Sequence, residues 1–191
     1  MLEFAKPFFE KPANKQLALE VGPGDNPILN ESTFHQTIFI DNEFQETSKN
    51  KINENFLTFK SQKKFDLIYD RLCWHEQNKN DWHLFLKNII HHLMPGGLFI
   101  SEHAIFHNNL LFEETYLSYN QLTNELKNLR NKNSIRFIPE SRYIENCLMK
   151  SNLEIKYFTV PFGTKVILER SNTQIKNTDP DLLKLIAKKP L

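Results

Sequence analysis

The stretch Leu17-Ala-Leu-Glu-Val-Gly-Pro-Gly-Asp-Asn-Pro27 joins a short apolar run to a glycine-rich turn. The run is too short for a helix and is bounded by turn residues, so it predicts a buried β-strand whose end carries an acid, Glu20. Gly22 and Gly24 let the backbone turn sharply and come close to a ligand. Because open α/β sheets bind ligands at the carboxyl ends of their strands, Glu20 and the two glycines mark a candidate binding site.

A second apolar run, residues 37–40, predicts another short strand and is followed by Asp41. Asp41 comes about 20 residues after Glu20, the offset at which an acid meets ribose hydroxyls in dinucleotide sites. A carboxylate there accepts two hydrogen bonds from neighbouring hydroxyls, and Glu43 is an alternative for this role. Pro27 stands where the dinucleotide motif has its third glycine, which disfavours a dinucleotide ligand.

Composition narrows the class of protein. The 191 residues suffice for one domain with a sizeable core. The net charge of +1 gives no reason to expect a nucleic-acid partner. Cys73 and Cys147 form neither a disulfide framework nor a metal motif, which fits a reducing cytosol. No apolar run approaches the ~18 residues of a membrane span, and the first residues lack a signal-peptide pattern. We therefore expect a cytoplasmic protein without membrane association.

The pattern Glu20-x-Gly22-x-Gly24 followed by Asp41 resembles the nucleoside-binding signature of class I S-adenosylmethionine (SAM)-dependent methyltransferases. The passage Leu93-Met-Pro-Gly-Gly97, between an amphipathic helix and an apolar strand, is similar to another segment of that family. The resemblance covers roughly residues 15–170. It implies an α/β fold, a Rossmann-like three-layer sandwich whose mostly parallel seven-stranded sheet has an antiparallel last strand. It also implies SAM as the cofactor, bound by Glu20, Gly22, Pro23, Gly24, Asp41 and Asn42.

Two further segments, Asn55-Phe-Leu57 and Phe65-Asp-Leu-Ile-Tyr-Asp-Arg71, resemble the thiopurine and small-thiol branch of these enzymes. In that branch an Asp at the position of Asn55 contacts the adenine amino group, and an amide oxygen also accepts a hydrogen bond from an amine. The resemblance adds Asn55, Phe56, Asp70 and Arg71 to the expected cofactor-binding residues. An Asp70–Arg71 ion pair is the structural alternative.

Candidate catalytic residues follow the fourth and fifth expected strands. His75 suits a general base, because the pKa of a free histidine is about 6.5, and His103 ends the fifth strand. Trp74 suits stacking on adenine or on an aromatic substrate, and His107 lies in the next loop. The alternatives are a core position for Trp74 and a capping or surface position for His75. The spacing of the three histidines matches no compact metal motif, so we expect no metal.

Periodicity and turn residues predict the remaining elements. Strands are expected at residues 17–21, 37–40, 55–59, 65–70, 98–101, 153–158 and 165–169. Helices are expected at residues 28–34, 45–51, 80–94, 113–131, 141–150 and from 179 onward, the first two being short.

Three segments are expected: a lead-in and possible lid with Phe8 and Phe9 at residues 1–16, the SAM-binding methyltransferase domain at 17–170, and a tail with a short helix at 171–191. The tail helix would cap the core or dock a second subunit, so a monomer and a homodimer both remain open. The expected activity is methyl transfer to a small-molecule acceptor, compact and apolar, with a soft nucleophile such as a thiol. The alternatives are a catalytically inactive methyltransferase-like scaffold that binds a protein partner and, less favoured, an NAD(P)-dependent oxidoreductase.

Overall fold

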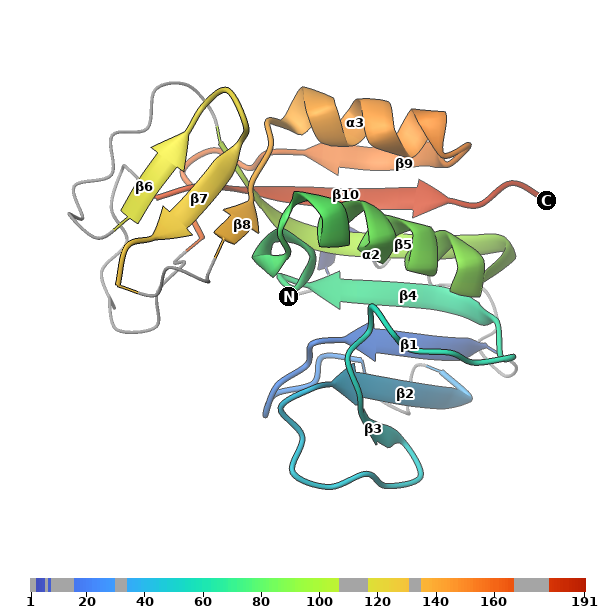
Figure 1. Cartoon of the computed structure of the whole chain (residues 1–191). Helices are drawn as coiled ribbons and strands as arrows, with labels where there is room; N and C mark the ends of the chain where they lie inside the picture. Colours follow the sequence, from blue (N-terminus) through green and yellow to red (C-terminus); the bar gives the residue numbers. More distant parts are fainter. Residues whose placement is uncertain are drawn as a thin grey trace.

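The computed structural model describes residues 3–5, 7, 16–29, 34–106, 117–130, 135–166 and 179–191. Seven strands form one sheet in the order β3-β2-β1-β4-β5-β10-β9 (Figure 1). β10 is antiparallel to both of its neighbours, and the other pairs are parallel. This confirms the predicted sheet with its antiparallel last strand. The strands are β1 Leu17–Val21, β2 Gln36–Asp41, β3 Lys51–Asn53, β4 Phe65–Arg71, β5 Leu93–Ile105, β9 Glu154–Thr159 and β10 Asp181–Lys188.

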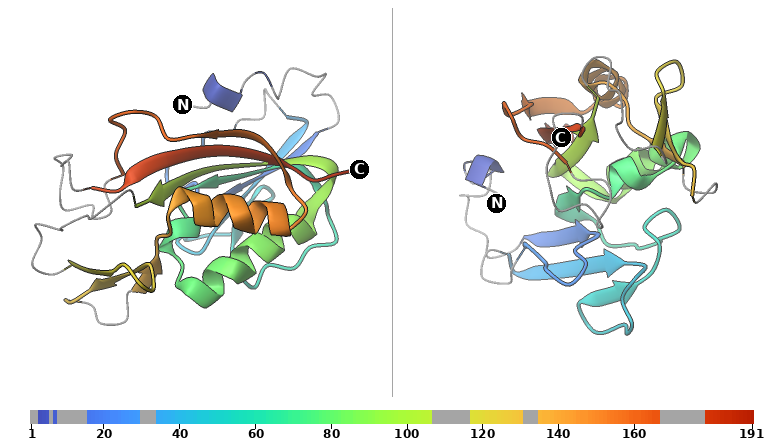
Figure 2. Two further views of the ribbon diagram at one scale, coloured as in Figure 1. Left: turned by 90° about the horizontal axis from the view of Figure 1, so that it is seen from above. Right: turned by 90° about the vertical axis from the view of Figure 1, so that its left-hand side faces the viewer.

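Two α-helices cover the same face of the sheet, α2 Lys79–His92 and α3 Ser141–Lys150, and both were predicted (Figure 2). The side chain of Asn78 caps α2 by accepting hydrogen bonds from the backbone N–H groups of Asn80 and Asp81. Trp82, Phe85, Leu86 and Ile89 of α2 are buried against the sheet. A short 3₁₀ helix, η1 Glu3–Ala5, lies on the opposite face. A second one, η2 Trp74–Glu76, follows β4.

The tail forms a strand where a helix was expected. Residues 181–188 are β10, between β5 and β9, and the expected seventh strand at 165–169 is represented by a single bridge from Lys165 to Asp181 in its described part. Leu183 and Leu185 pack on one face of the sheet and Ile186 packs on the other. A strand buried on both faces loses the two-residue alternation. The leucines of this segment therefore resembled one apolar face of a helix.

A small antiparallel sheet replaces the helix expected at 113–131. Its strands are β6 Leu117–Asn120, β7 Glu125–Asn128 and β8 Ile135–Phe137, and it lies beside the carboxyl ends of the parallel strands (Figure 1). The Asn120 side chain accepts hydrogen bonds from two backbone N–H groups in the β6–β7 turn, and Asn124 adopts a φ of 56°. Local hydrogen bonds of this kind compete with helix formation. Residues 113–116 and 131 of the expected helix lie outside the described residues.

Loops take the place of the two short helices expected early in the chain. Residues 26–29 and 45–50 have no helical turn, and 30–33 lie outside the described residues. Residues 55–59, expected as the third strand, form a turn that follows β3, and the Asn88 side chain of α2 donates to the carbonyls of Phe56 and Leu57. Phe56 and Phe59 enter the core from this turn. None of the described helices is long and apolar enough to span a membrane.

Candidate functional site

The glycine-rich turn after β1 is joined to the end of β2. Gly24 donates its backbone N–H to Oδ2 of Asp41 (3.0 Å), and Glu43 donates its own to Oδ1 (2.9 Å). Gly22 and Gly24 have φ values of 69° and 55°, which favour glycine. A Cβ at Gly24 would meet nothing within 4 Å, so the space over this residue is open. Asp41 and the open face of Gly24 therefore form a cradle at the carboxyl edge.

Glu20 binds the backbone at the end of this turn through hydrogen bonds. It is fully buried and accepts hydrogen bonds from the backbone N–H groups of Ile28 (3.0 Å) and Leu29 (2.8 Å), so both carboxylate oxygens have partners. Burial raises the pKa of the Glu20 carboxyl, and the two N–H groups partly oppose that rise. Sequence reasoning placed Glu20 toward the crevice. In this structure it fixes the end of the turn instead.

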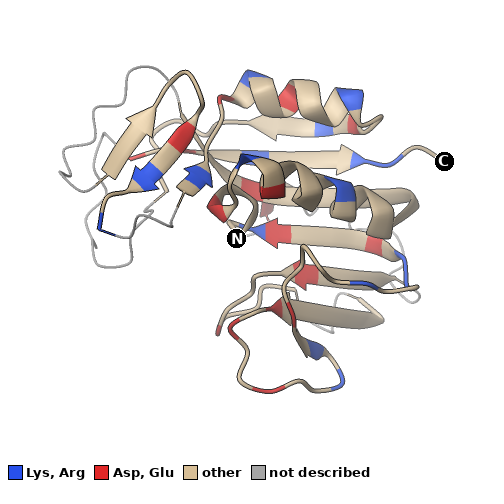
Figure 3. Cartoon of the chain, in the orientation of Figure 1, with Lys and Arg blue, Asp and Glu red and all other residues tan. Residues whose placement is uncertain are grey.

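Asp70 plays the same part at the end of β4. Its carboxylate accepts hydrogen bonds from the backbone N–H groups of Cys73 (3.0 Å) and Trp74 (3.1 Å) and from the hydroxyl of Ser101 (2.6 Å). Burial raises the pKa of Asp70 to about 6, against the effect of these donors. Figure 3 shows acidic positions at the ends of β1, β2 and β4. Each of these three acids holds the loop at the end of its own strand.

Cys73 closes part of the site. A Cβ placed on Gly22 would lie 1.7 Å from the Cys73 sulfur, so the thiol packs directly on this glycine. Burial and the nearby acids Asp70 and Asp41 raise the pKa of the thiol well above its usual value, so it is protonated. Leu72, just before it, has a φ of 61° although it is not a glycine. Strained backbone of this kind is concentrated at functional sites.

The other residues expected at the cofactor are dispersed. Arg71 donates to the carbonyl oxygen of Asn26 (2.7 Å), which ties β4 to the glycine turn, and no Asp70–Arg71 pair forms. Pro23 is buried within that turn, and Asn42 is exposed after β2. Asn55 is exposed, and its side chain accepts from the backbone N–H of Leu57 (2.9 Å).

Two aromatic residues from these predictions belong to the core. Phe56 lies 4.8 Å from Phe85 between ring centroids, beneath α2. Trp74 is fully buried, stacks on Trp82 at 4.2 Å and donates its ring N–H to the Trp82 carbonyl oxygen (2.9 Å). Neither ring is placed to stack on a ligand, which corrects the expectation for Trp74 and for a direct contact by Phe56.

His75 lies at the carboxyl edge with an orienting carboxylate. Its Nε2 lies 3.3 Å from Oε1 of Glu76, whose Oε2 lies 2.6 Å from Nε of Arg136 on β8. His75 is 2% exposed and Glu76 is 40% exposed, so the pair extends from the interior toward the surface. Nδ1 of His75 is buried and has no hydrogen-bond partner among the described residues. A carboxylate bound to one ring nitrogen fixes the tautomer of a histidine.

His103 lies beside His75, 5.7 Å away between ring centroids, and is fully buried. Neither of its ring nitrogens has a hydrogen-bond partner in the part of the chain that the structure describes. Burial, and then the neighbouring His75, lower the pKa of His103 well below its usual value, so the ring is neutral near pH 7. His107 lies outside the described residues. Within the described ranges no three metal-ligating side chains come together.

Sequence reasoning missed two residues of the site, Cys73 and Ser101. Cys73 comes two residues after the end of β4, which is the signal by which it could have been found, and Ser101 lies within β5, where it is paired with Asp70 of β4. Their roles depend on contacts across strands, Cys73 with Gly22 and Ser101 with Asp70. Contacts of this kind are not visible in the spacing of residues along the chain.

No family model and no curated protein matches this chain. Solved structures do match. The 1,6-didemethyltoxoflavin-N1-methyltransferase of Burkholderia thailandensis, solved with 1,6-didemethyltoxoflavin and S-adenosylhomocysteine, is 12% identical over 100% of this chain and 78% of its own, with a TM-score of 0.65. A SAM-dependent methyltransferase of Methanosarcina mazei is 13% identical over 97% of both chains, with a TM-score of 0.62. The N-methyltransferase NodS of Bradyrhizobium japonicum, solved with S-adenosylhomocysteine, is 13% identical over 92% of this chain and 79% of its own, with a TM-score of 0.57. The chain thus has the Rossmann-like fold of class I SAM-dependent methyltransferases.

Proposed function

We propose that this protein is a SAM-dependent methyltransferase that acts on a small-molecule acceptor. The observation that carries the proposal is the cradle formed by Gly24 and Asp41, at the carboxyl edge of a sheet with the methyltransferase strand order. The same edge receives ligands in open α/β sheets generally. Neighbours of this fold were solved with S-adenosylhomocysteine, the product that SAM leaves after methyl transfer.

The residues of the cradle fit the nucleoside end of SAM. Asp41 is partly exposed, and a carboxylate accepts hydrogen bonds from a pair of ribose hydroxyls. Asn42 and Glu43 follow it on the exposed side of the same loop. Glu20 acts indirectly in this proposal, because it holds the turn that carries Gly24. Asp70 acts in the same way on the loop of Cys73.

SAM supplies a methyl group already activated by its sulfonium. The protein then has to hold the acceptor in line and, for acceptors that carry a proton, to remove it. His75 is the base in this proposal, because Glu76 holds its ring and Nδ1 has no partner among the described residues. His103 supports His75 as a neutral neighbour in a buried site.

For the acceptor we propose a compact, largely apolar molecule with a soft nucleophile, a thiol or a small heteroaromatic. The motif around Asp70 and Arg71 supports a thiol. Two neighbours described above are N-methyltransferases, one of them solved with a heteroaromatic acceptor, which supports a ring nitrogen. The small sheet β6–β8 adjoins the edge through an apolar cluster that includes Phe106, Leu126 and Ile138, with Leu72 and Tyr119 packed against it.

The test is a thermal-shift and calorimetry panel with SAM, S-adenosylhomocysteine, NAD and no ligand. We expect the two sulfur nucleosides to raise the melting temperature and NAD to have no effect. Thiols, heteroaromatic amines, carboxylic acids and phenols are then screened with SAM labelled in its methyl group. Methylation of carboxylic acids alone would contradict the acceptor class and leave the reaction class intact. Stabilisation by NAD alone would contradict both.

One observation favours a second candidate, a methyltransferase-like scaffold without catalysis that binds a protein partner. The Cys73 thiol covers Gly22, and the three strand-end acids are occupied by the protein's own donors. Failure of SAM, S-adenosylhomocysteine and NAD to bind in this panel would contradict the first candidate and favour this second one.

A further inference from the structure

A groove of about 520 Å³ runs between α2 and α3, on the face of the sheet that both helices cover. Each helix contributes four residues to its lining. Their spacing along the sequence, three, one and three positions, places them on one face of the helix. These residues are His83, Leu86, Lys87 and Ile90 on α2 and Tyr143, Asn146, Cys147 and Lys150 on α3, with Ser151 at one end. The groove is separate from the carboxyl-edge site, because none of its residues belongs to the loops of Gly24, Asp41 or Asp70.

The floor of the groove is apolar, and polar side chains border it. Leu86 is buried and Ile90 is half-buried, so their side chains offer a hydrocarbon surface. The Tyr143 hydroxyl lies 3.1 Å from Nε2 of His83. A volume of this size, with an apolar floor and polar side chains around it, suits a small amphipathic ligand.

The charge at the rim has one sign. Lys87 and Lys150 are exposed, and neither forms an ion pair with a described residue. No aspartate or glutamate lines the groove. Lysine carries its charge at the end of a flexible apolar stem, so both ammonium groups can reach a ligand that rests on the floor.

We propose that this groove binds a small amphipathic anion, an aromatic or short aliphatic monocarboxylate. Its apolar body lies on Leu86 and Ile90, and its carboxylate faces Lys87 and Lys150. The Tyr143 hydroxyl supplies a polar contact at the side. This binding is independent of methyl transfer and of SAM.

The experiment uses three probes of one shape and different charge: 2-naphthoate, 2-naphthylmethanol and 2-naphthylmethylammonium. Binding to the full chain is measured by calorimetry and located by ¹H–¹⁵N NMR. We expect 2-naphthoate to shift amide signals of residues 83–90 and 143–151 and to bind at least about tenfold more tightly than the alcohol. The ammonium probe should not bind.

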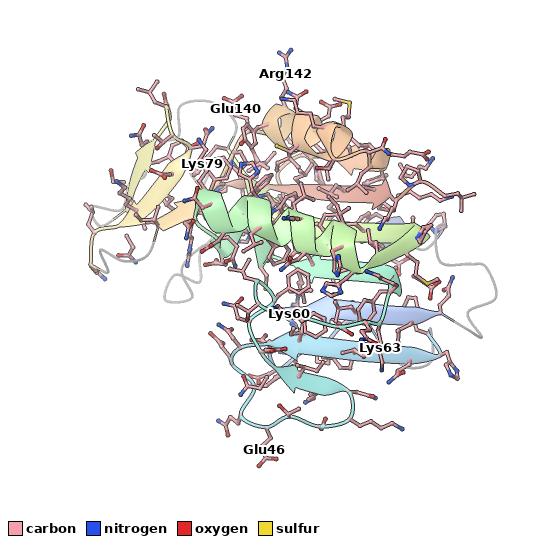
Figure 4. All side chains as sticks on the ribbon, turned by 45° about the vertical axis from the view of Figure 1, so that its right-hand side comes forward. Glu46, Lys60, Lys63, Lys79, Glu140 and Arg142 are labelled. Atoms are coloured by element: carbon pink, nitrogen blue, oxygen red, sulfur yellow. The ribbon has the colours of Figure 1, made fainter. Side chains whose placement is uncertain are left out.

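Three variants locate the site. Asn146→Trp places a large ring over the groove from an exposed position and should abolish binding of 2-naphthoate. The double variant Lys87→Gln with Lys150→Gln should weaken it about tenfold and leave the alcohol unaffected. The control is Lys60→Gln, an exposed lysine on the loop between β3 and β4, on the side of α2 away from α3 (Figure 4).

Two results would overturn the proposal. In the first, 2-naphthoate binds Asn146→Trp as tightly as the parent, or shifts signals at residues 22–26 and 41–43 in place of the helices. In the second, sedimentation shows that the parent is a dimer and that Asn146→Trp is a monomer, which would make the groove an interface between two copies of this chain.

Discussion

The carboxylate of Asp41 and the backbone N–H of Gly24 join the ends of two adjacent parallel strands, through a hydrogen bond of 3.0 Å. The proposed function gives this carboxylate a second task, to accept the ribose hydroxyls of SAM. Asp41→Ala should weaken binding of S-adenosylhomocysteine by about 1.5 to 3 kcal/mol, the contribution of a charge-assisted hydrogen bond. Calorimetry measures this, with Asp25→Ala in the same exposed turn as the control. Equal affinity in Asp41→Ala and the parent would remove Asp41 from the site.

Gly22 and Gly24 should differ in their tolerance of alanine. Both have positive φ, so both substitutions carry a backbone cost of about 1–2 kcal/mol. At Gly22 the added Cβ also meets the Cys73 sulfur, while at Gly24 it meets nothing. Denaturant unfolding should therefore show a larger loss of stability for Gly22→Ala, and Cys73→Ala in that background should restore part of it. Equal losses at the two glycines would contradict the close contact.

Asp70 should make the stability depend on pH in an unusual direction. Its pKa is raised from 3.8 to about 6 in the folded protein, so the folded state holds a proton that the unfolded state releases. The contribution of Asp70 to the free energy of unfolding is thus fully present below about pH 4 and is lost as the pH rises through 6. The total change is about 3 kcal/mol. Asp70→Asn keeps an acceptor for the Cys73 and Trp74 N–H groups and cannot titrate. Unfolding of parent and variant from pH 4 to 7 should give a difference that changes over this window, and a constant difference would refute the assignment.

His103 should make the stability depend on pH in the opposite direction to Asp70. Its pKa is lowered in the folded protein, so the unfolded state takes up a proton first as the pH falls below about 6.5, and stability is lost there. His103→Leu removes two buried nitrogens that have no partner among the described residues. It should raise the free energy of unfolding by about 1 kcal/mol or more at pH 8, and by more at pH 5. His35→Gln, at an exposed position, serves as the control. A gain that is the same at both pH values would mean that His103 does not titrate differently on unfolding.

His75→Gln tests the proposed base. Turnover with a protonated acceptor should fall by about 100-fold or more, while the affinity for S-adenosylhomocysteine stays as in the parent. Glu76→Gln should also lower the turnover, because Glu76 holds the ring of His75. Unchanged turnover in His75→Gln would assign the ring a structural role.

The sequence predicts the central part of the fold well. Strands β1, β2 and β4 are short apolar runs bounded by turn residues, and α2 has a clear apolar stripe ended by Pro95 and Gly96. The prediction is wrong where a segment takes its structure from distant partners. β10 is buried on both faces, so its leucines give no alternation, and the β6–β7 turn depends on local bonds from Asn120.

The predictions for the candidate site were also partly right and partly wrong. The acids at the strand ends were found, because apolar runs followed by an acid are visible in the sequence. The partners of each acid could not be predicted. Glu20, Asp41 and Asp70 all accept hydrogen bonds from backbone N–H groups of loops, and the sequence does not fix the course of these loops. Trp74 and Phe56 were placed at the ligand by their neighbours in the chain, and the packing beneath α2 takes both into the core.

The place of β10 has a consequence for synthesis of the chain. In the described sheet, β9 touches only β10, and β10 is made after every other strand. While the ribosome is still adding residues 160–180, β9 has nothing to pair with and the edge of β5 is open. An unpaired apolar edge can pair with other chains, so a ribosome that stalls in this interval would release an aggregation-prone fragment. Completion of residues 181–188 closes that edge and brings β9 into the sheet in the same event.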